Sequence, residues 1–162
     1  MGIDMAHNVK MLGTGNAFLP NGRLHSHVLI DDKHLIDAPP TALIGLRNRG
    51  IPVNTIETIF ITHLHGDHVF GLPFLFLERK YISDREGNSP LKIIAAPGAK
   101  ERITNLCNLA YPGSLEEFLT QVAWIEDDTG ITDDGWSWER FRVHHDDSVD
   151  PFGYRFESSD GA

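Results

Sequence analysis

A short histidine-rich motif constrains this chain more than any other feature of its sequence. Three histidines and one aspartate fall within the six positions 63–68, in the segment Thr62-His63-Leu64-His65-Gly66-Asp67-His68. The preceding residues 56–61 are rich in β-branched and aromatic side chains, which predicts a strand, and the apolar residues 69–77 predict a buried helix. At such a strand-to-helix turn, side chains of odd and even positions can converge instead of alternating between two faces.

The residue types in this motif are those that bind metal ions. Neutral imidazole is the commonest protein ligand of transition metals, and a carboxylate adds negative charge without sulfur. A lone histidine is more often a packed or surface residue, but four ligand-type side chains in six positions are hard to explain that way. The single cysteine, Cys107, is expected to be a buried structural thiol. The motif therefore predicts a nitrogen- and oxygen-ligated site, which suits Zn²⁺, Mn²⁺ or Fe.

Length and charge limit the class of protein. The chain has 162 residues, enough for one domain with a substantial core, and no apolar run approaches the roughly 18 residues of a membrane span. Its first ten residues lack the apolar segment of a secretion signal, so a cytoplasmic location is expected. The net charge of −9 is concentrated after Trp124. No basic patch is visible, which argues against tight binding of a long polyanion and leaves a small phosphodiester as a candidate.

Strand-like and helix-like segments alternate, which predicts the α/β class with mixed sheets. Thr41 is expected to cap one helix, and Ser114 another, with Glu117 in the capping-box position. The expected strands are 9–12, 27–30, 34–36, 56–61, 91–95, 122–125, 136–145 and 152–156, and the expected helices are 42–50, 69–77, 99–109 and 115–120, with an acidic turn region over 127–135.

Two other features outside the motif resemble binding sites. His25 and His27 stand two positions apart, as metal ligands on a strand would, but they are interpreted as non-ligands because no third partner lies nearby in the sequence. Gly13-Thr14-Gly15 follows a strand, and a lone Gly-x-Gly is weak evidence for phosphate binding. A structural turn is therefore favoured over a phosphate cradle at this position.

The motif and its surroundings resemble a known family. Residues 62–68 carry the His-x-His-x-Asp-His signature of the metallo-β-lactamase superfamily, and flanking segments look like its ribonuclease Z branch. These segments are 12–17, 35–38, 59–62, 71–73, 97–98 and 152–155. The resemblance implies an αββα sandwich, of which residues 1–162 would be a single incomplete domain, truncated to the first half plus one or two strands. The implied activity is metal-dependent phosphodiester hydrolysis of the tRNA 3′ processing type.

The resemblance also implies a ligand set. His63 and His65 would bind one metal ion, and Asp67 and His68 would bind a second, so that the complete family site holds two zinc ions. Two divalent ions can neutralise charge on a phosphoryl oxygen and make hydroxide available at neutral pH. Asp67 is the expected catalytic residue, because it could orient the attacking water or accept its proton.

A third histidine from a later strand would complete the first site. His145 is favoured over the alternative His144, because the family pattern of apolar-x-His fits Val143-His144-His145 and strand alternation places His145 on the face of Val143. The family's Gly-Asp-Thr segment and its final histidine do not occur in this chain, and Asp37-Ala38-Pro39 replaces the usual Asp-x-Gly. The sequence thus supports a complete first site and half of a second.

Three hypotheses follow. The first is a phosphodiesterase or ribonuclease Z-like enzyme that acts on a small phosphodiester or an RNA 3′ end. The second is a hydrolase of the same fold that cleaves a lactone, thioester or lactam, and the third is a non-catalytic metal-binding remnant. An uncovered apolar face could also lead the chain to self-associate as a homodimer.

Overall fold

The centre of the molecule is a six-stranded sheet. The computed structural model describes residues 7–159 and 161. The strands of this sheet are β1 (Val9–Gly13), β2 (His27–Ile30), β3 (His34–Ile36), β4 (Thr58–Phe60), β5 (Lys92–Ile94) and β6 (Ala123–Ile125). They lie in sequence order, with β1, β2 and β3 antiparallel and β3 to β6 parallel. The expected hairpin of β2 and β3 is confirmed.

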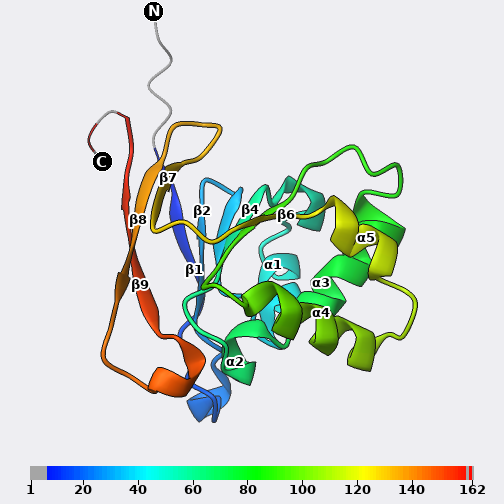
Figure 1. Ribbon diagram of the computed structural model, residues 1–162, viewed down its shortest axis with the longest axis horizontal. Coiled ribbons are helices and arrows are strands. Elements are labelled where there is room, and N and C mark those ends of the chain that lie inside the picture. Colours follow the sequence, from blue (N-terminus) through cyan, green and yellow to red (C-terminus); the bar gives the residue numbers. More distant parts are fainter. Residues whose placement is uncertain (1–6, 160, 162) are drawn as a thin grey trace, which may run out of the picture.

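Helices cover one face of this sheet (Figure 1). They are α1 (Ala42–Arg47), α3 (Leu72–Glu78), α4 (Ala99–Ala110) and α5 (Glu116–Gln121), and a short α2 (Gly66–Val69) precedes α3. Single-turn elements are η1 (Pro20–Gly22), η2 (Val53–Thr55), η3 (Arg79–Ser83) and η4 (Asp147–Val149). The main core fills the space between sheet and helices, where Leu35, Ile93 and Leu72 are fully buried. Cys107 also lies in this core, as predicted.

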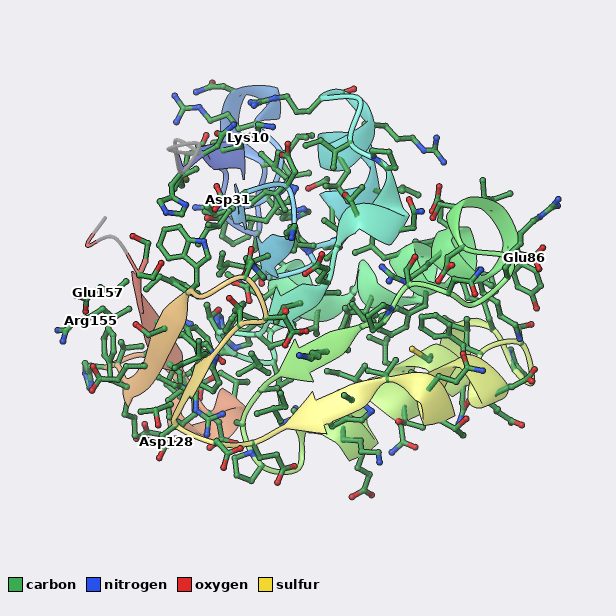
Figure 2. The ribbon with its side chains drawn as sticks, turned by 90° about the horizontal axis from the view of Figure 1, so that it is seen from above. Lys10, Asp31, Glu86, Asp128, Arg155 and Glu157 are labelled. Carbon is green, nitrogen blue, oxygen red and sulfur yellow. The ribbon has the colours of Figure 1, made fainter. Side chains whose placement is uncertain are left out.

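A second sheet covers the opposite face. Its antiparallel strands are β7 (Thr129–Ile131), β8 (Ser137–Arg142) and β9 (Phe152–Glu157). The Phe60 ring of β4 meets Trp138, Tyr154 and Phe156 edge to face, with ring centroids 4.8–5.7 Å apart. Figure 2 shows Arg155 and Glu157, by contrast, on the outer side of β9. The described residues thus form helix, sheet and sheet layers, and the predicted α/β class with mixed sheets is confirmed.

Several local expectations were wrong. β7 lies within residues 127–135, which were expected to be only a turn region. β8 ends at Arg142, so the expected strand does not reach position 145. Thr41 is the N-cap residue of α1, as expected, but its side chain makes no capping hydrogen bond, and the N-cap residue of α5 is Leu115 rather than Ser114. The Thr41 hydroxyl instead accepts the backbone N–H of His25 at 3.0 Å, so a tertiary contact replaces the local one.

The apolar segment 69–77 forms two helices rather than one. Gly71 separates α2 from α3, and a Cβ at this position would lie 1.9 Å from the carbonyl oxygen of Pro39. The Gly71 N–H donates to the Ala38 carbonyl at 2.8 Å. This close backbone approach ties the chain after the motif to the loop that follows β3. Among the described residues, no helix is long and apolar enough to cross a membrane.

Candidate metal centre

The histidine motif opens into a cavity of about 740 Å³. The motif follows β4, and the loop that begins at Asp37 follows the neighbouring parallel strand β3. The carboxyl ends of these parallel strands therefore meet at one edge of the sheet, which is where open α/β sheets bind ligands. Asp67, His68 and His145 line the same cavity as His63 and His65.

Three of the predicted ligands form a compact cluster. Ligand nitrogens of His63, His65 and His145 all lie within 4.8 Å of one another. Their ring centroids are 4.9, 5.0 and 5.2 Å apart, and Nε2 of His145 lies 3.4 Å from Nδ1 of His65. His145 lines the cavity and its neighbour His144 does not, although both are exposed residues of the same loop. Three imidazoles around one point fit a transition-metal ion with a fourth position open.

His145 reaches the cluster by a route that the sequence did not predict. Because β8 has ended at Arg142, a loop rather than strand alternation sets its position. Backbone hydrogen bonds attach this loop to the motif, from the N–H of Leu64 to the carbonyl of Val149 at 3.3 Å and from the N–H of Phe152 to the carbonyl of Thr62 at 2.8 Å. Tertiary contacts therefore carry His145 to the two histidines of the motif.

Asp67 and His68 lie beside this cluster rather than inside it. Both belong to α2, and Nε2 of His68 lies 3.4 Å from the Asp67 carboxylate. The rings of His63 and His68 are 4.0 Å apart between centroids, so the two groups share one cavity. Within the described part of the chain, His63, His65 and His145 are the only group of three or more His, Cys, Asp or Glu side chains whose ligand atoms lie within 4.8 Å of one another.

Asp37 is a site residue whose role the sequence did not reveal. It is 4% exposed and accepts three hydrogen bonds: from the N–H of Thr62 at 2.8 Å, from the hydroxyl of Thr62 at 2.7 Å and from Nδ1 of His68 at 2.6 Å. Its φ of 62° lies in the left-handed region that Asp and Asn tolerate better than most residues. The signal available in the sequence was a carboxylate directly after the predicted strand 34–36, and the pairing of that strand with the motif strand came only from the fold.

The charges of these neighbours set the protonation of the histidines. Burial, together with the nearby His68, lowers the pKa of His63 to about 4, so its ring is neutral at pH 7. Burial would also lower the pKa of His68, but the hydrogen bond and negative charge of Asp37 outweigh it, and that pKa is raised. The two rings therefore differ in proton affinity although their centroids are 4.0 Å apart.

The remaining candidate residues make local packing contacts, and His27, Thr14 and Gly15 also line the histidine cavity. His25 contacts the Thr41 hydroxyl through Nδ1 at 3.1 Å. His27 is 1% exposed, and its Nδ1 bonds the His25 carbonyl at 2.7 Å. Gly13 packs so closely on this segment that a Cβ would lie 2.0 Å from the His25 carbonyl oxygen, which fits the turn predicted there.

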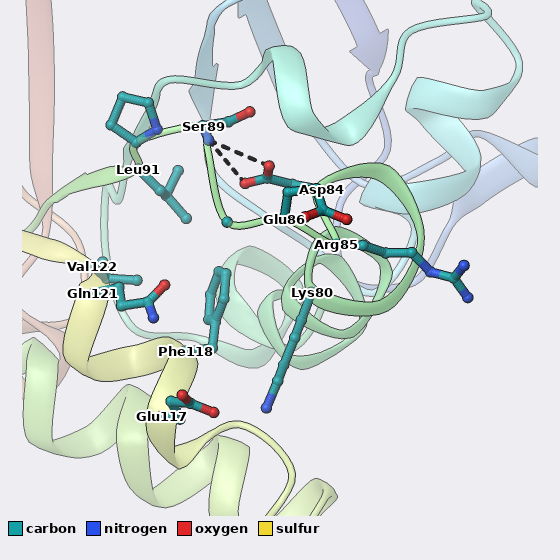
Figure 3. A pocket seen from close by; sticks show the side chains of 12 residues that line it. Lys80, Asp84, Arg85, Glu86, Ser89, Leu91, Glu117, Phe118, Gln121 and Val122 are labelled. Atoms are coloured by element: carbon teal, nitrogen blue, oxygen red, sulfur yellow. Dashed lines mark hydrogen bonds between the residues drawn. The ribbon is translucent and has the colours of Figure 1, made fainter.

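A second cavity of about 330 Å³ lies between α5 and the loop before β5 (Figure 3). Phe118 and Leu91 give it an apolar lining, and Lys80 and Asp84 bring charges of both signs. The Ser89 N–H donates to both carboxylate oxygens of Asp84, at 3.3 and 3.1 Å. Among the described residues that line it, none was predicted from the sequence as a site residue, so the functional argument stays with the histidine cavity.

The fold is shared with solved structures of other proteins. The short form of human tRNase Z superposes with a TM-score of 0.70 at 24% identity, over 96% of this chain and 65% of that one. Zn²⁺-bound PqqB from Methylobacterium extorquens superposes with a TM-score of 0.66 at 18% identity, over 95% of this chain and 62% of that one. This fold is that of the metallo-β-lactamase superfamily, and together with the ribonuclease Z relatives described next it places the chain in the ribonuclease Z-like branch.

Sequence comparison specifies the family further. A ribonuclease Z of Bacillus cereus (strain B4264) is 31% identical over 160 residues, which are 92% of this chain and 48% of that protein. The family model described as "Anti-Pycsar protein Apyc1" matches residues 7–156. The chain belongs to this anti-Pycsar Apyc1 family. It spans about half the length of the curated relatives that it matches.

Proposed function

We propose that this chain carries the metal site of a metal-dependent phosphodiesterase of the ribonuclease Z type. The observation that supports this most is the cluster of His63, His65 and His145 in a cavity of about 740 Å³. The donor set fits a zinc ion, because three imidazole nitrogens with an open fourth position are a catalytic pattern for zinc. Zinc is the proposed ion, with Mn or Fe as alternatives that the same nitrogen and oxygen donors accept.

In this proposal the chain's residues have distinct roles. His63, His65 and His145 hold the first ion, and Asp67 and His68 supply half of a second site. A bound divalent ion lowers the pKa of water to about 7 and polarises a phosphoryl oxygen. Asp67 orients the attacking water or accepts its proton, since its carboxylate lines the cavity beside the cluster.

A small phosphodiester is the preferred substrate class. The net charge of −9 opposes the approach of a long polyanion, whereas one phosphodiester can be neutralised locally by metal ions. The relatives named ribonuclease Z make an RNA 3′ end the second candidate. The family description, anti-Pycsar protein, states a biological role rather than a substrate, and we extend that role to this chain as part of the proposal. A cytoplasmic location and homodimer formation belong to the same proposal.

Metal binding tests the proposal directly. We expect elemental analysis of the purified chain to find about one tightly held transition-metal ion, because three strong ligands complete only one site. His145→Ala should abolish retention of that ion, and His144→Ala is the matched control, because it removes the adjacent imidazole, which does not line the cavity. Absence of metal in the wild-type chain, or equal loss in both variants, would contradict the assignment.

Hydrolysis of bis(p-nitrophenyl) phosphate tests the second half of the site. We expect the 162-residue chain to hydrolyse it poorly or not at all, because Asp67 and His68 alone are too few ligands for a second ion. Robust metal-dependent turnover by the purified chain would overturn this expectation and would show that one complete site is sufficient.

A further inference from the structure

Two of the three motif histidines have an outer partner that orients the ring. Nδ1 of His63 lies 2.9 Å from the Thr62 hydroxyl, which itself donates to Asp37. Nδ1 of His68 donates to Asp37 directly. In both rings the nitrogen on the far side, Nε2, is left to act as the ligand atom. Metal-binding histidines in proteins almost always hold such a partner on the nitrogen that faces away from the metal.

The third motif histidine, His65, faces the cluster with Nδ1 rather than with Nε2. Its Nδ1 lies 3.4 Å from Nε2 of His145, so Nδ1 points into the three-histidine cluster. Its Nε2 therefore points outward, and the Asp146 carboxylate oxygen Oδ2 lies 3.4 Å from it. The outward nitrogen of this third ring thus also meets a carboxylate, supplied by a different loop.

The Asp146 side chain is held in place by its own loop. Its Oδ1 accepts the N–H of Ser148 at 2.9 Å and the Ser148 hydroxyl at 2.7 Å. Asp146 is also the N-cap of η4, and the loop is attached to the motif by the bond from Leu64 to Val149. With Oδ1 engaged inside the loop, Oδ2 is left to face His65.

We propose that Asp146 is a positioning residue of the metal centre: it accepts the Nε2–H of His65 and so presents the unprotonated Nδ1 to the metal ion. This inference rests on the metal site proposed above. The carboxylate fixes the tautomer, because a proton on Nε2 leaves the lone pair on Nδ1. The Asp146 carboxylate also raises the basicity of Nδ1, the ligand nitrogen of His65. Because Asp146 lies in the same loop as His145, this one loop supplies one ligand and orients another.

The test compares Asp146→Asn with Asp147→Asn. Asparagine has only one acceptor oxygen. If that oxygen keeps the bonds to Ser148, the amide NH₂ group faces Nε2 of His65 and can only donate to it. The ring proton is then favoured on Nδ1, where the proton competes with the metal ion. Asp147→Asn is the matched control, because it removes the same charge one residue away, from a side chain that is 82% exposed and pairs with Arg142. Asp146→Glu keeps the carboxylate and serves as the rescue variant.

Two measurements are made on each variant. Competition with a chromophoric chelator gives the zinc dissociation constant, and the visible absorption spectrum of the Co²⁺ form reports the geometry around the ion. We expect Asp146→Asn to bind zinc about 10–100-fold more weakly than the wild type and to alter the Co²⁺ spectrum. Asp147→Asn should stay within about threefold, and Asp146→Glu should recover most of the affinity, as a carboxylate partner requires.

The outcomes separate this inference from the function on which it rests. A wild-type chain that binds no ion would overturn the proposed metal centre and this role with it. A wild-type chain that binds zinc, with Asp146→Asn unchanged in affinity and spectrum, would overturn the role of Asp146 alone. Equal weakening in Asp146→Asn and Asp147→Asn would also overturn it, because the effect would then be one of net charge rather than of a specific partner.

Discussion

Replacing Asp37 by asparagine should weaken the fold around the candidate metal centre. The carboxylate is 4% exposed and accepts three hydrogen bonds of 2.6–2.8 Å from Thr62 and His68. Asparagine has nearly the same size and also tolerates the left-handed backbone at this position. Asp37→Asn therefore changes the charge and the acceptor count while leaving backbone strain unaltered.

The size of the effect follows from the bonds that are lost. The asparagine oxygen can keep the Thr62 N–H, but its NH₂ group then faces the Thr62 hydroxyl and Nδ1 of His68. Hydrogen bonds to charged groups contribute about 1.5–3 kcal/mol each, and the Thr62 hydroxyl can rotate, so we expect a loss of about 2–4 kcal/mol in the free energy of unfolding. That corresponds to a decrease in Tm of about 5–15 °C for a chain of this length.

Urea unfolding in the presence of a metal chelator measures this quantity without added stabilisation by bound metal. Thr62→Val is the graded comparison, because it removes only the hydroxyl and leaves the bond between Asp37 and His68. We expect this variant to lose about 1–3 kcal/mol, because the hydroxyl bonds both Asp37 and Nδ1 of His63 and each bond contributes about 0.5–1.5 kcal/mol. An Asp37→Asn protein within about 0.5 kcal/mol of the wild type would refute the reasoning that this buried carboxylate organises the site.

Three further predictions concern stability, pH and thiol reactivity. Arg79→Lys should lower the free energy of unfolding by about 2–4 kcal/mol in urea, because the buried guanidinium donates to four carbonyl oxygens at 2.7–3.1 Å that a lysine cannot bridge; an unchanged midpoint would contradict this. In the metal-free folded chain, burial lowers the pKa of His63 to about 4 from the 6.5 of the free side chain, so the unfolded chain takes up this proton first as the pH falls. The free energy of unfolding should therefore decrease between pH 6.5 and 4, and it should decrease less steeply in His63→Gln. Equal slopes for the two proteins would exclude His63 as the cause. Burial raises the pKa of Cys107 to about 12, so an aromatic disulfide reagent should modify it only in urea, and rapid labelling of the folded chain would disprove this burial.

The sequence determined the local features of the site. The strand before the motif, the turn and the ligand-type side chains all lie within about a dozen consecutive positions, and residue periodicity reports local structure. The same kind of signal predicted the hairpin of β2 and β3 and the helix α4, and both are confirmed. That His63, His65 and His145 bind a metal ion stays a prediction until binding is measured.

Tertiary structure decided the partners of the motif. Parallel pairing of β3 with β4, with Ile36 opposite Phe60, places Asp37 beside Thr62 although 25 residues separate them. Two backbone hydrogen bonds fold the loop after β8 onto the motif, so His145 meets His65 without a strand to carry it. Such contacts leave no periodic trace in the sequence, because they depend on which strands pair and in what register. The sequence could therefore give the identity of the ligand-type residues, but only the fold could show which side chains orient them.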